Sequence, residues 1–203
     1  TLLPPIEPTL LPPIDALPES DFTAKRLLED LPPGQDIFYR IAFADLSDVN
    51  AVSEPSVGHF RTAPLDTRSL KFAWSGDTAG QGWGINPAMG GMRIYETMLA
   101  REPDLFLHSG DTIYADGPIP SEIKLPDGSL WKNITTEAKS KVAETLEEFR
   151  GAYLYNLLDE NVRRFNAEVP QVWQWDDHEV MNNWSPSKDL SDNPAYRVKD
   201  IGV

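Results

Sequence analysis

The stretch Asp104-Leu105-Phe106-Leu107-His108-Ser109-Gly110-Asp111-Thr112 sets an apolar run directly before a Ser-Gly-Asp-Thr tetrapeptide. The same tetrapeptide recurs at Ser75–Thr78 after the run Leu70–Trp74, and a third run spans Val169–Trp175. All three runs have the length and the aromatic or β-branched content of buried strands. The sequence therefore predicts an α/β fold with an open sheet of parallel strands.

Each of these runs is followed by a carboxylate, namely Asp77, Asp111 and Asp177. In an open parallel sheet, ligands bind at the carboxyl ends of the strands. We therefore expect the three side chains to converge on one crevice although they lie far apart in the sequence. Three converging carboxylates indicate a metal site.

The segments between the runs have helical and loop character. Met89–Arg101 has apolar residues at helical spacing, which predicts one strand–helix–strand unit, and a long helical region is predicted over residues 142–157. Ala115–Asn133 is rich in Pro and Gly. A loop of that length in a compact domain is typical of a lid or a binding loop.

The N-terminal part of the chain has a different sequence pattern. Residues 1–8 and 9–16 form a near-perfect repeat with Pro pairs, which predicts an extended Pro-rich linker over residues 1–35. Asp36–Ala44 and Gly58–Thr62 read as two strands around a polar loop. Two strands alone are marginally stable, so residues 36–66 are expected to be the tail of a small β domain.

The composition limits the classes of function. The chain has 203 residues, 40% of them hydrophobic, which is enough for a core of about one domain. A net charge of −14 without a Lys/Arg block argues against a nucleic-acid scaffold, although bound cations would still allow an anionic substrate. The absence of Cys excludes thiol nucleophiles and disulfides, and no segment reaches the ~20 apolar residues of a membrane span. No signal peptide is visible, so we expect a processed or trimmed start.

Glycines around the first motif, Gly76–Gly84, suit a sharp turn and a close approach of the backbone to a ligand. A dinucleotide fingerprint fails because Ile85 stands where its last Gly or Ala is required. The chain also has no Gly-Lys-Ser/Thr phosphate loop. Both of these nucleotide-binding classes are therefore excluded.

In the second motif, Asp111 and Tyr114 are three residues apart and can ligate one ion together. A phenolate oxygen suits Fe(III), whereas carboxylates alone also suit Ca²⁺, Mg²⁺ or Mn²⁺. The alternative is that Asp111 is a helix cap or turn former and that Tyr114 is a core aromatic residue.

The third motif, Trp175–Trp184, places six polar groups within nine positions after an apolar run. This density is costly to bury without ions or hydrogen bonds, the alternative being a solvated turn. His178, beside a metal-binding Asp177, can donate a proton or a hydrogen bond to a phosphoryl or leaving-group oxygen. Together the motifs favour a two-metal site for phosphoryl transfer, with Asp111 as the bridging ligand. His59 and His108 are interpreted as structural.

Three segments carry a resemblance to a known family: Phe60–Pro64, His108–Tyr114 and Trp175–Val180 with the following Asn182-Asn183. They resemble the PhoD-like alkaline phosphatases and phosphodiesterases of the calcineurin-like metallophosphatase superfamily, over about residues 36–200. The resemblance implies a metallophosphatase α/β sandwich, preceded by the tail of an immunoglobulin-like β domain. It also implies Fe(III) and Ca²⁺ as active-site ions and export to the periplasm or the cell exterior.

The resemblance implies a role for five residues. Asp77 would be a ligand of the first metal, Asp111 the bridging ligand, Tyr114 the phenolate on iron, Asp177 a ligand of the second metal and His178 the catalytic histidine. Relatives often have Cys at the position of Asp77. Asp favours a harder ion, which widens the choice to Mn²⁺ or Mg²⁺. The family's histidine ligands lie downstream of these motifs, so residues 67–203 are expected to be the N-terminal half of the catalytic domain.

The function expected from these residues is hydrolysis of a small phosphate mono- or diester by a metal-dependent enzyme. We assign Trp131, in the Pro/Gly-rich loop, and Asn182 to substrate binding. One alternative is an esterase that prefers diesters, including phospholipids. Another is a non-catalytic surface module whose acidic clusters hold structural calcium.

Overall fold

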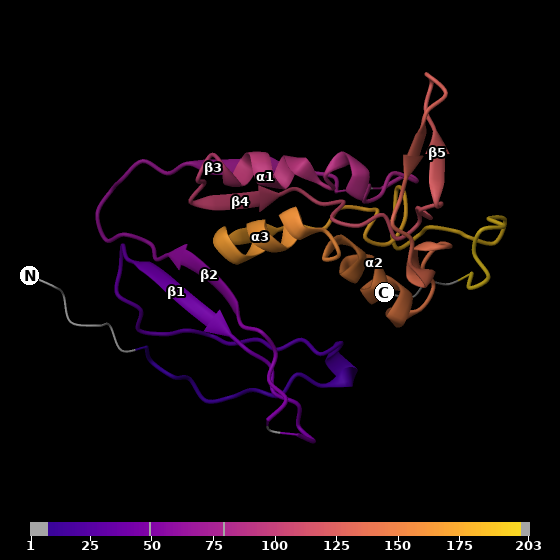
Figure 1. Cartoon of the computed structure of the whole chain (residues 1–203). Coiled ribbons are helices and arrows are strands. Elements are labelled where there is room, and N and C mark those ends of the chain that lie inside the picture. The colour runs from indigo at the N-terminus through magenta and orange to yellow at the C-terminus, as the bar shows by residue number, and fades with distance from the viewer. Residues whose placement is uncertain (1–7, 49, 79, 200–203) are drawn as a thin grey trace, which may run out of the picture. The chain divides into compact units, whose positions relative to one another are not determined.

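The computed structural model describes residues 8–48, 50–78 and 80–199, and the chain divides into two compact units, Thr1–Pro32 and Pro33–Val203 (Figure 1). In the first unit the single helical turn is η1 (Pro18–Ser20), among the residues described there. The second copy of the Pro-rich repeat, Thr9–Ala16, has no regular secondary structure, as its Pro pairs predict. The first copy lies almost entirely outside the described residues.

The second unit begins with an antiparallel hairpin of β1 (Asp36–Ile41) and β2 (Ser56–Arg61). This confirms the two strands predicted around a polar loop. The Tyr39 hydroxyl donates a hydrogen bond of 2.9 Å to the Ala167 carbonyl, at the end of helix α3 (Glu160–Glu168). Gly58 leaves room for this contact, because a Cβ there would lie 2.3 Å from the same carbonyl oxygen.

A three-stranded sheet forms the centre of the second unit. Its strands are β3 (Phe72–Ser75), β4 (Leu105–His108) and β7 (Gln171–Trp173), in the order β3-β4-β7 and all parallel. Helix α1 (Arg93–Leu99) connects β3 to β4, whereas α2 (Leu146–Asn156) and α3 lie between β4 and β7. The predicted parallel sheet and strand–helix–strand unit are therefore confirmed, and the fold is mixed α/β.

Helices α1 and α3 both pack on the same face of the sheet. Tyr95 of α1 and Phe165 of α3 form one buried cluster with Phe106 of β4. Right-handed crossovers that advance across a sheet in one direction place their helices on one face. The other face is not packed in this way: Trp74 and Val172, which flank Leu107 in register, are 71% and 55% exposed. The runs were interpreted as buried strands, whereas in the described chain this face of the sheet is exposed at Trp74 and Val172.

The helical region predicted over residues 142–157 also differs from the helix that the structure contains. Helix α2 begins only at Leu146, because Thr145 and Glu148 form a capping box, and Val142 packs instead with Val180 and Met181. A second helix, α3, starts after Asp159, whose carboxylate accepts hydrogen bonds from the first turn. The predicted range 142–157 thus contains one helix, α2, and α3 lies beyond it and was not predicted.

The predicted loop Ala115–Asn133 contains regular structure. It carries a hairpin of β5 (Glu122–Lys124) and β6 (Leu130–Lys132), which projects from the rest of the unit in Figure 1. Two short 3-10 turns complete the secondary structure of the described residues, η2 (Pro87–Met89) and η3 (Glu137–Lys139). None of the helices found in the described part of the chain has the length and apolarity needed to cross a membrane.

Candidate metal centre

The turns that follow β3 and β4 are joined by backbone hydrogen bonds. The amide of Asp77 donates to the Gly110 carbonyl at 3.1 Å, and the amide of Thr78 donates to the Asp111 carbonyl at 2.8 Å. These bonds continue the parallel pairing beyond the strands. The two copies of Ser-Gly-Asp-Thr therefore lie side by side, and both deliver their aspartates to the carboxyl edge of the sheet.

Both aspartates have a left-handed backbone, with φ of 56° at Asp77 and 54° at Asp111. Asp adopts this region more readily than most residues, and such conformations are concentrated at functional sites. Gly110 has φ of 95°, and a Cβ there would lie 2.4 Å from the Cβ of Asp176. Gly110 thus lets the turn after β4 touch the turn after β7.

This contact brings the second and third motifs together. Asp111, Asp177 and His178 each offer a ligand atom, and these atoms lie within 4.8 Å of one another. The amide of His178 donates to Asp111 Oδ1 at 3.1 Å. A buried carboxylate, a partly buried carboxylate and an imidazole therefore face one small volume.

Asp77 and Tyr114 extend this group. The Tyr114 hydroxyl donates to Asp77 Oδ1 at 2.9 Å, and the Tyr114 ring lies 4.3 Å from the ring of His178. Gly80 accommodates the tyrosine, since a Cβ there would lie 2.0 Å from its ring. All five residues that the sequence analysis assigned to metal binding or catalysis are thus neighbours.

Asp116 is an additional member of the group. Its Oδ1 lies 2.7 Å from Nδ1 of His178, and its Oδ2 accepts a hydrogen bond of 2.7 Å from the amide of Asn182. A carboxylate on one imidazole nitrogen fixes the orientation of the ring and leaves the other nitrogen for chemistry. The sequence shows only that Asp116 lies two positions after Tyr114, which does not reveal this contact.

The acidic groups of this site lie close together, an arrangement that favours a bound cation. The pKa of Asp111 is raised to about 6, chiefly by burial and also by Asp77 and Asp177, and His178 opposes this shift. Burial and the adjacent Asp77 also raise the pKa of Tyr114. Burial lowers the pKa of His178, but the hydrogen bond and charge of Asp116 outweigh it and the net shift is upward. Crowded anions with oxygen donors suit a hard cation, which would relieve their repulsion.

His108 has a structural role, as expected. It is buried, with Nε2 2.9 Å from the hydroxyl of Thr78 and Nδ1 3.4 Å from the hydroxyl of Thr112. Its ring stacks on Trp173. His108 therefore links the threonines of the two Ser-Gly-Asp-Thr copies. His59, the other histidine interpreted as structural, pairs with Glu168 where the β1–β2 hairpin meets α3.

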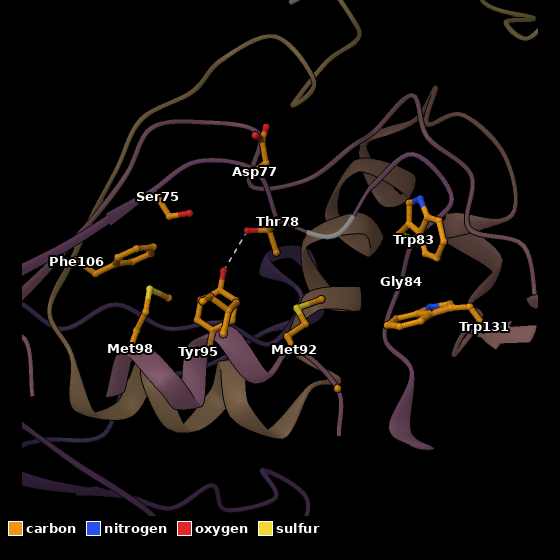
Figure 2. Close-up of a pocket in the computed structure, with 12 residues that line it drawn as sticks. Ser75, Asp77, Thr78, Trp83, Gly84, Met92, Tyr95, Met98, Phe106 and Trp131 are labelled. Carbon is orange, nitrogen blue, oxygen red and sulfur yellow. Dashed lines mark hydrogen bonds between the residues drawn. The ribbon is translucent and has the colours of Figure 1, made fainter. Parts of the chain in front are cut away.

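The two residues assigned to substrate binding lie at the margin of the group. Trp131 of β6 and Trp83 pack edge to face beside a pocket of about 240 Å³ whose lining includes Asp77. Figure 2 shows both indoles on one side of this pocket and Tyr95, Met98 and Phe106 on the other. Asn182 is exposed, and its backbone amide donates a hydrogen bond to Asp116 of the group.

Comparisons with known proteins give the class of the chain. Residues 72–201 match the family described as PhoD-like phosphatase, and residues 11–64 match its N-terminal domain. Because the first match alone covers more than half of the sequence, the chain belongs to the PhoD-like phosphatase family.

Two individual relatives illustrate this membership. Alkaline phosphatase D of Bacillus subtilis (strain 168) is 34% identical over 91 residues, which are 45% of this chain and 14% of that protein. A solved structure described as "Structure of PhoD" is 28% identical with a TM-score of 0.50, over 73% of this chain and 25% of that one. The chain thus spans about a quarter or less of the length of these relatives.

Proposed function

We propose that this chain carries part of the active site of a metal-dependent phosphoric ester hydrolase. The observation that carries the proposal is the gathering of Asp111, Asp177 and His178 at the carboxyl edge of the sheet. Membership in a phosphatase family supports the same reaction class. The substrate would be a small phosphate mono- or diester.

The donors favour two cations with Asp111 between them. Asp77 and Tyr114 are hydrogen-bonded to each other, and Asp111 lies in one cluster with Asp177 and His178. Carboxylate and phenolate oxygens fit Fe(III) with Ca²⁺, and the absence of thiolate donors also admits Mn²⁺ or Mg²⁺. When bound, such ions supply positive charge to the phosphoryl oxygens and lower the pKa of water.

The hydrogen bonds of His178 support a catalytic role for this residue. Asp116 engages Nδ1, so Nε2 is the nitrogen available to donate to a phosphoryl or leaving-group oxygen. Nε2 lies 4.0 Å from Asp177 Oδ1, beyond hydrogen-bond distance. Asp116 favours the protonated ring, as a hydrogen-bond donor requires.

The organic part of the ester is expected to contact the margin of the group. Trp131 shares a pocket with Asp77, which supports stacking of its indole on an apolar substituent. Asn182 is exposed, and its backbone amide donates to Asp116, so its side chain lies at the edge of the group. Comparing the turnover of mono- and diesters would identify the preferred substrate.

Further parts of the fold belong to the same proposal. We infer that residues 36–66 end an immunoglobulin-like domain and that residues 67–203 form the first half of the catalytic sandwich. The remaining metal ligands would then come from the part of the relatives that this chain does not match. The isolated chain is expected to bind metal weakly and to turn over slowly, within an enzyme of the periplasm or cell exterior. Ordinary enzyme rates from the isolated chain would contradict this.

The test is the metal content of the purified chain and of Asp111→Asn, measured by mass spectrometry after loading with iron, calcium or manganese. We expect bound metal that falls in this variant, because the replacement removes a central anionic ligand. Asp127→Asn is the matched control, because Asp127 also accepts hydrogen bonds from its own turn but lies in the projecting hairpin. Its metal content should equal that of the unsubstituted chain.

The same variants separate the proposal from a structural calcium module. Loss of metal with the fold retained in Asp111→Asn supports a catalytic site, whereas collapse of the fold supports a structural ion. Unchanged metal content would contradict the proposed site. In a protein that spans the full length of the relatives, Asp111→Asn should abolish ester hydrolysis.

A further inference from the structure

Glu179 is a buried carboxylate that lies between the turn after β4 and the turn after β7. The residue is 3% exposed, and in the described part of the chain its carboxylate accepts from backbone amides rather than from Lys or Arg. Burying an ionised carboxylate is costly unless hydrogen bonds replace its water. The hydrogen-bond donors to the Glu179 carboxylate therefore show which backbone segments this residue holds in place.

Three backbone amides donate to this carboxylate. Oε1 accepts from Thr112 at 2.6 Å, whereas Oε2 accepts from Asp111 at 3.3 Å and from Asp176 at 2.9 Å. Two of these donors lie in the turn after β4 and the third lies in the turn after β7. Hydrogen bonds to an ionised acceptor are stronger than neutral ones. Glu179 thus ties the two turns to each other.

Neighbouring contacts help to fix the positions of the same two turns. Gly110 allows the backbones of the two turns to touch, and the side-chain amide of Asn156 on α2 holds the Thr112 carbonyl at 2.7 Å. The Asp111 carboxylate is left to face Asp177 and His178. The distance between ligands of the two turns therefore depends on the carboxylate of Glu179.

We propose that Glu179 is a positioning residue that sets the separation of Asp111 and Asp177 for cation binding. The inference rests on the proposed function, because a cation is what requires this separation. Glu179 touches neither the substrate nor the reacting atoms. It acts through the backbone that carries the ligands, as outer partners of metal ligands do.

Two variants of Glu179 test the proposal. Glu179→Gln keeps the shape but replaces one oxygen by an NH₂ group that cannot accept, so either the amide of Thr112 or the amides of Asp111 and Asp176 lose their acceptor. Glu179→Asp keeps the charge but is one methylene too short to reach both turns. We expect both to weaken Mn²⁺ binding by about 10–100-fold, measured by calorimetric titration of the folded 203-residue chain.

The matched control is Glu144→Gln. Glu144 also accepts from two backbone amides, those of Arg197 and Val198, but neither of these donors belongs to the turns that carry Asp111, Asp177 and His178. It should leave the Mn²⁺ affinity unchanged. Wild-type affinity in Glu179→Asp with loss only in Glu179→Gln would show a charge effect and overturn the proposal. Reduced stability of both variants with unchanged affinity would also overturn it.

Amide hydrogen exchange without metal provides a second readout, which separates this inference from the proposed function. We expect faster exchange at residues 109–112 and 176–178 in Glu179→Gln, and unchanged exchange in the β5–β6 hairpin. If the unsubstituted chain binds no Mn²⁺, the proposed function is contradicted, and this pattern would still establish the tie between the turns. Unchanged exchange at both turns would overturn it.

Discussion

At the scale of single residues, the candidate centre depends on backbone positions that few side chains tolerate. Asp77 and Asp111 adopt the same left-handed conformation in the two copies of Ser-Gly-Asp-Thr. Gly110 adds a contact with Asp176 that has no space for a side chain. The short repeat thus encodes a geometry as well as a pair of carboxylates.

Gly110→Ala should therefore disturb the centre by two separable effects. A positive φ costs an Ala residue about 1–2 kcal/mol, and overlap with Asp176 should add about 1–3 kcal/mol. Gly128→Ala is the control, since Gly128 has φ of 86° and no heavy atom within 4 Å of a Cβ built there. Urea unfolding should show the larger loss for Gly110→Ala, together with weaker Mn²⁺ binding. Equal losses would show that the contact with Asp176 has no energetic weight.

At the scale of elements, polar caps decide where the helices begin. The apolar spacing over 142–157 predicts one helical region, but the cap at Thr145 starts α2 three residues later, and Asp159 starts the unpredicted helix α3. The Asp159 carboxylate accepts from Asn161 at 2.9 Å and Val162 at 3.1 Å, and also from Met92 at 2.8 Å near the start of α1. It therefore connects the two helices that cover the sheet.

Asp159→Ala should destabilise the chain more than Thr145→Ala does. Loss of an exposed cap such as Thr145 costs about 1 kcal/mol. Loss of Asp159, which is 3% exposed, also leaves buried amides without an acceptor, so we expect about 2–4 kcal/mol. The free energies of unfolding in urea give both values. A similar loss in the two variants would show that the bond to Met92 contributes nothing.

At the scale of the whole molecule, the order β3-β4-β7 explains which face of the sheet is covered. Both crossovers advance in one direction, so α1 and α3 lie together on one face. The row Trp74, Leu107 and Val172 lies on the other face, with Trp74 and Val172 mostly exposed. Contiguous exposed apolar rows are typical of surfaces that another part of a protein covers. In the proposed sandwich, the second half of the catalytic domain would cover this row.

Val172→Thr tests this arrangement with little change of shape. In the present chain the exposed position should change the free energy of unfolding by less than about 0.5 kcal/mol. In a protein spanning the full length of the relatives, a buried hydroxyl at this position should cost about 1–3 kcal/mol. Val162→Thr, in the buried cluster between α3 and β4, should be costly in both. An equally small effect of Val172→Thr in both proteins would contradict the sandwich.

The sequence by itself determined the elements and the chemistry near the sheet edge. Apolar runs with strand character and a repeated Ser-Gly-Asp-Thr predicted a parallel sheet with carboxylates after its strands, because strand propensity and strand-end geometry are local or general properties. The same reasoning predicted that Asp77, Asp111 and Asp177 would converge, and the structure places Asp111 and Asp177 in one cluster and Asp77 beside it. What these ligands hold remains the proposal tested by Asp111→Asn.

Only the tertiary structure decided which partner each side chain meets. Asp116 and Glu179 stand in the sequence as two acidic residues among many, and their contacts with His178 and with the amides of Asp111 and Thr112 span more than 60 positions. The hairpin within Ala115–Asn133, helix α3 and the open face of the sheet were likewise not predicted. A local pattern records which groups are present, whereas a hydrogen bond between distant turns depends on how the whole chain packs.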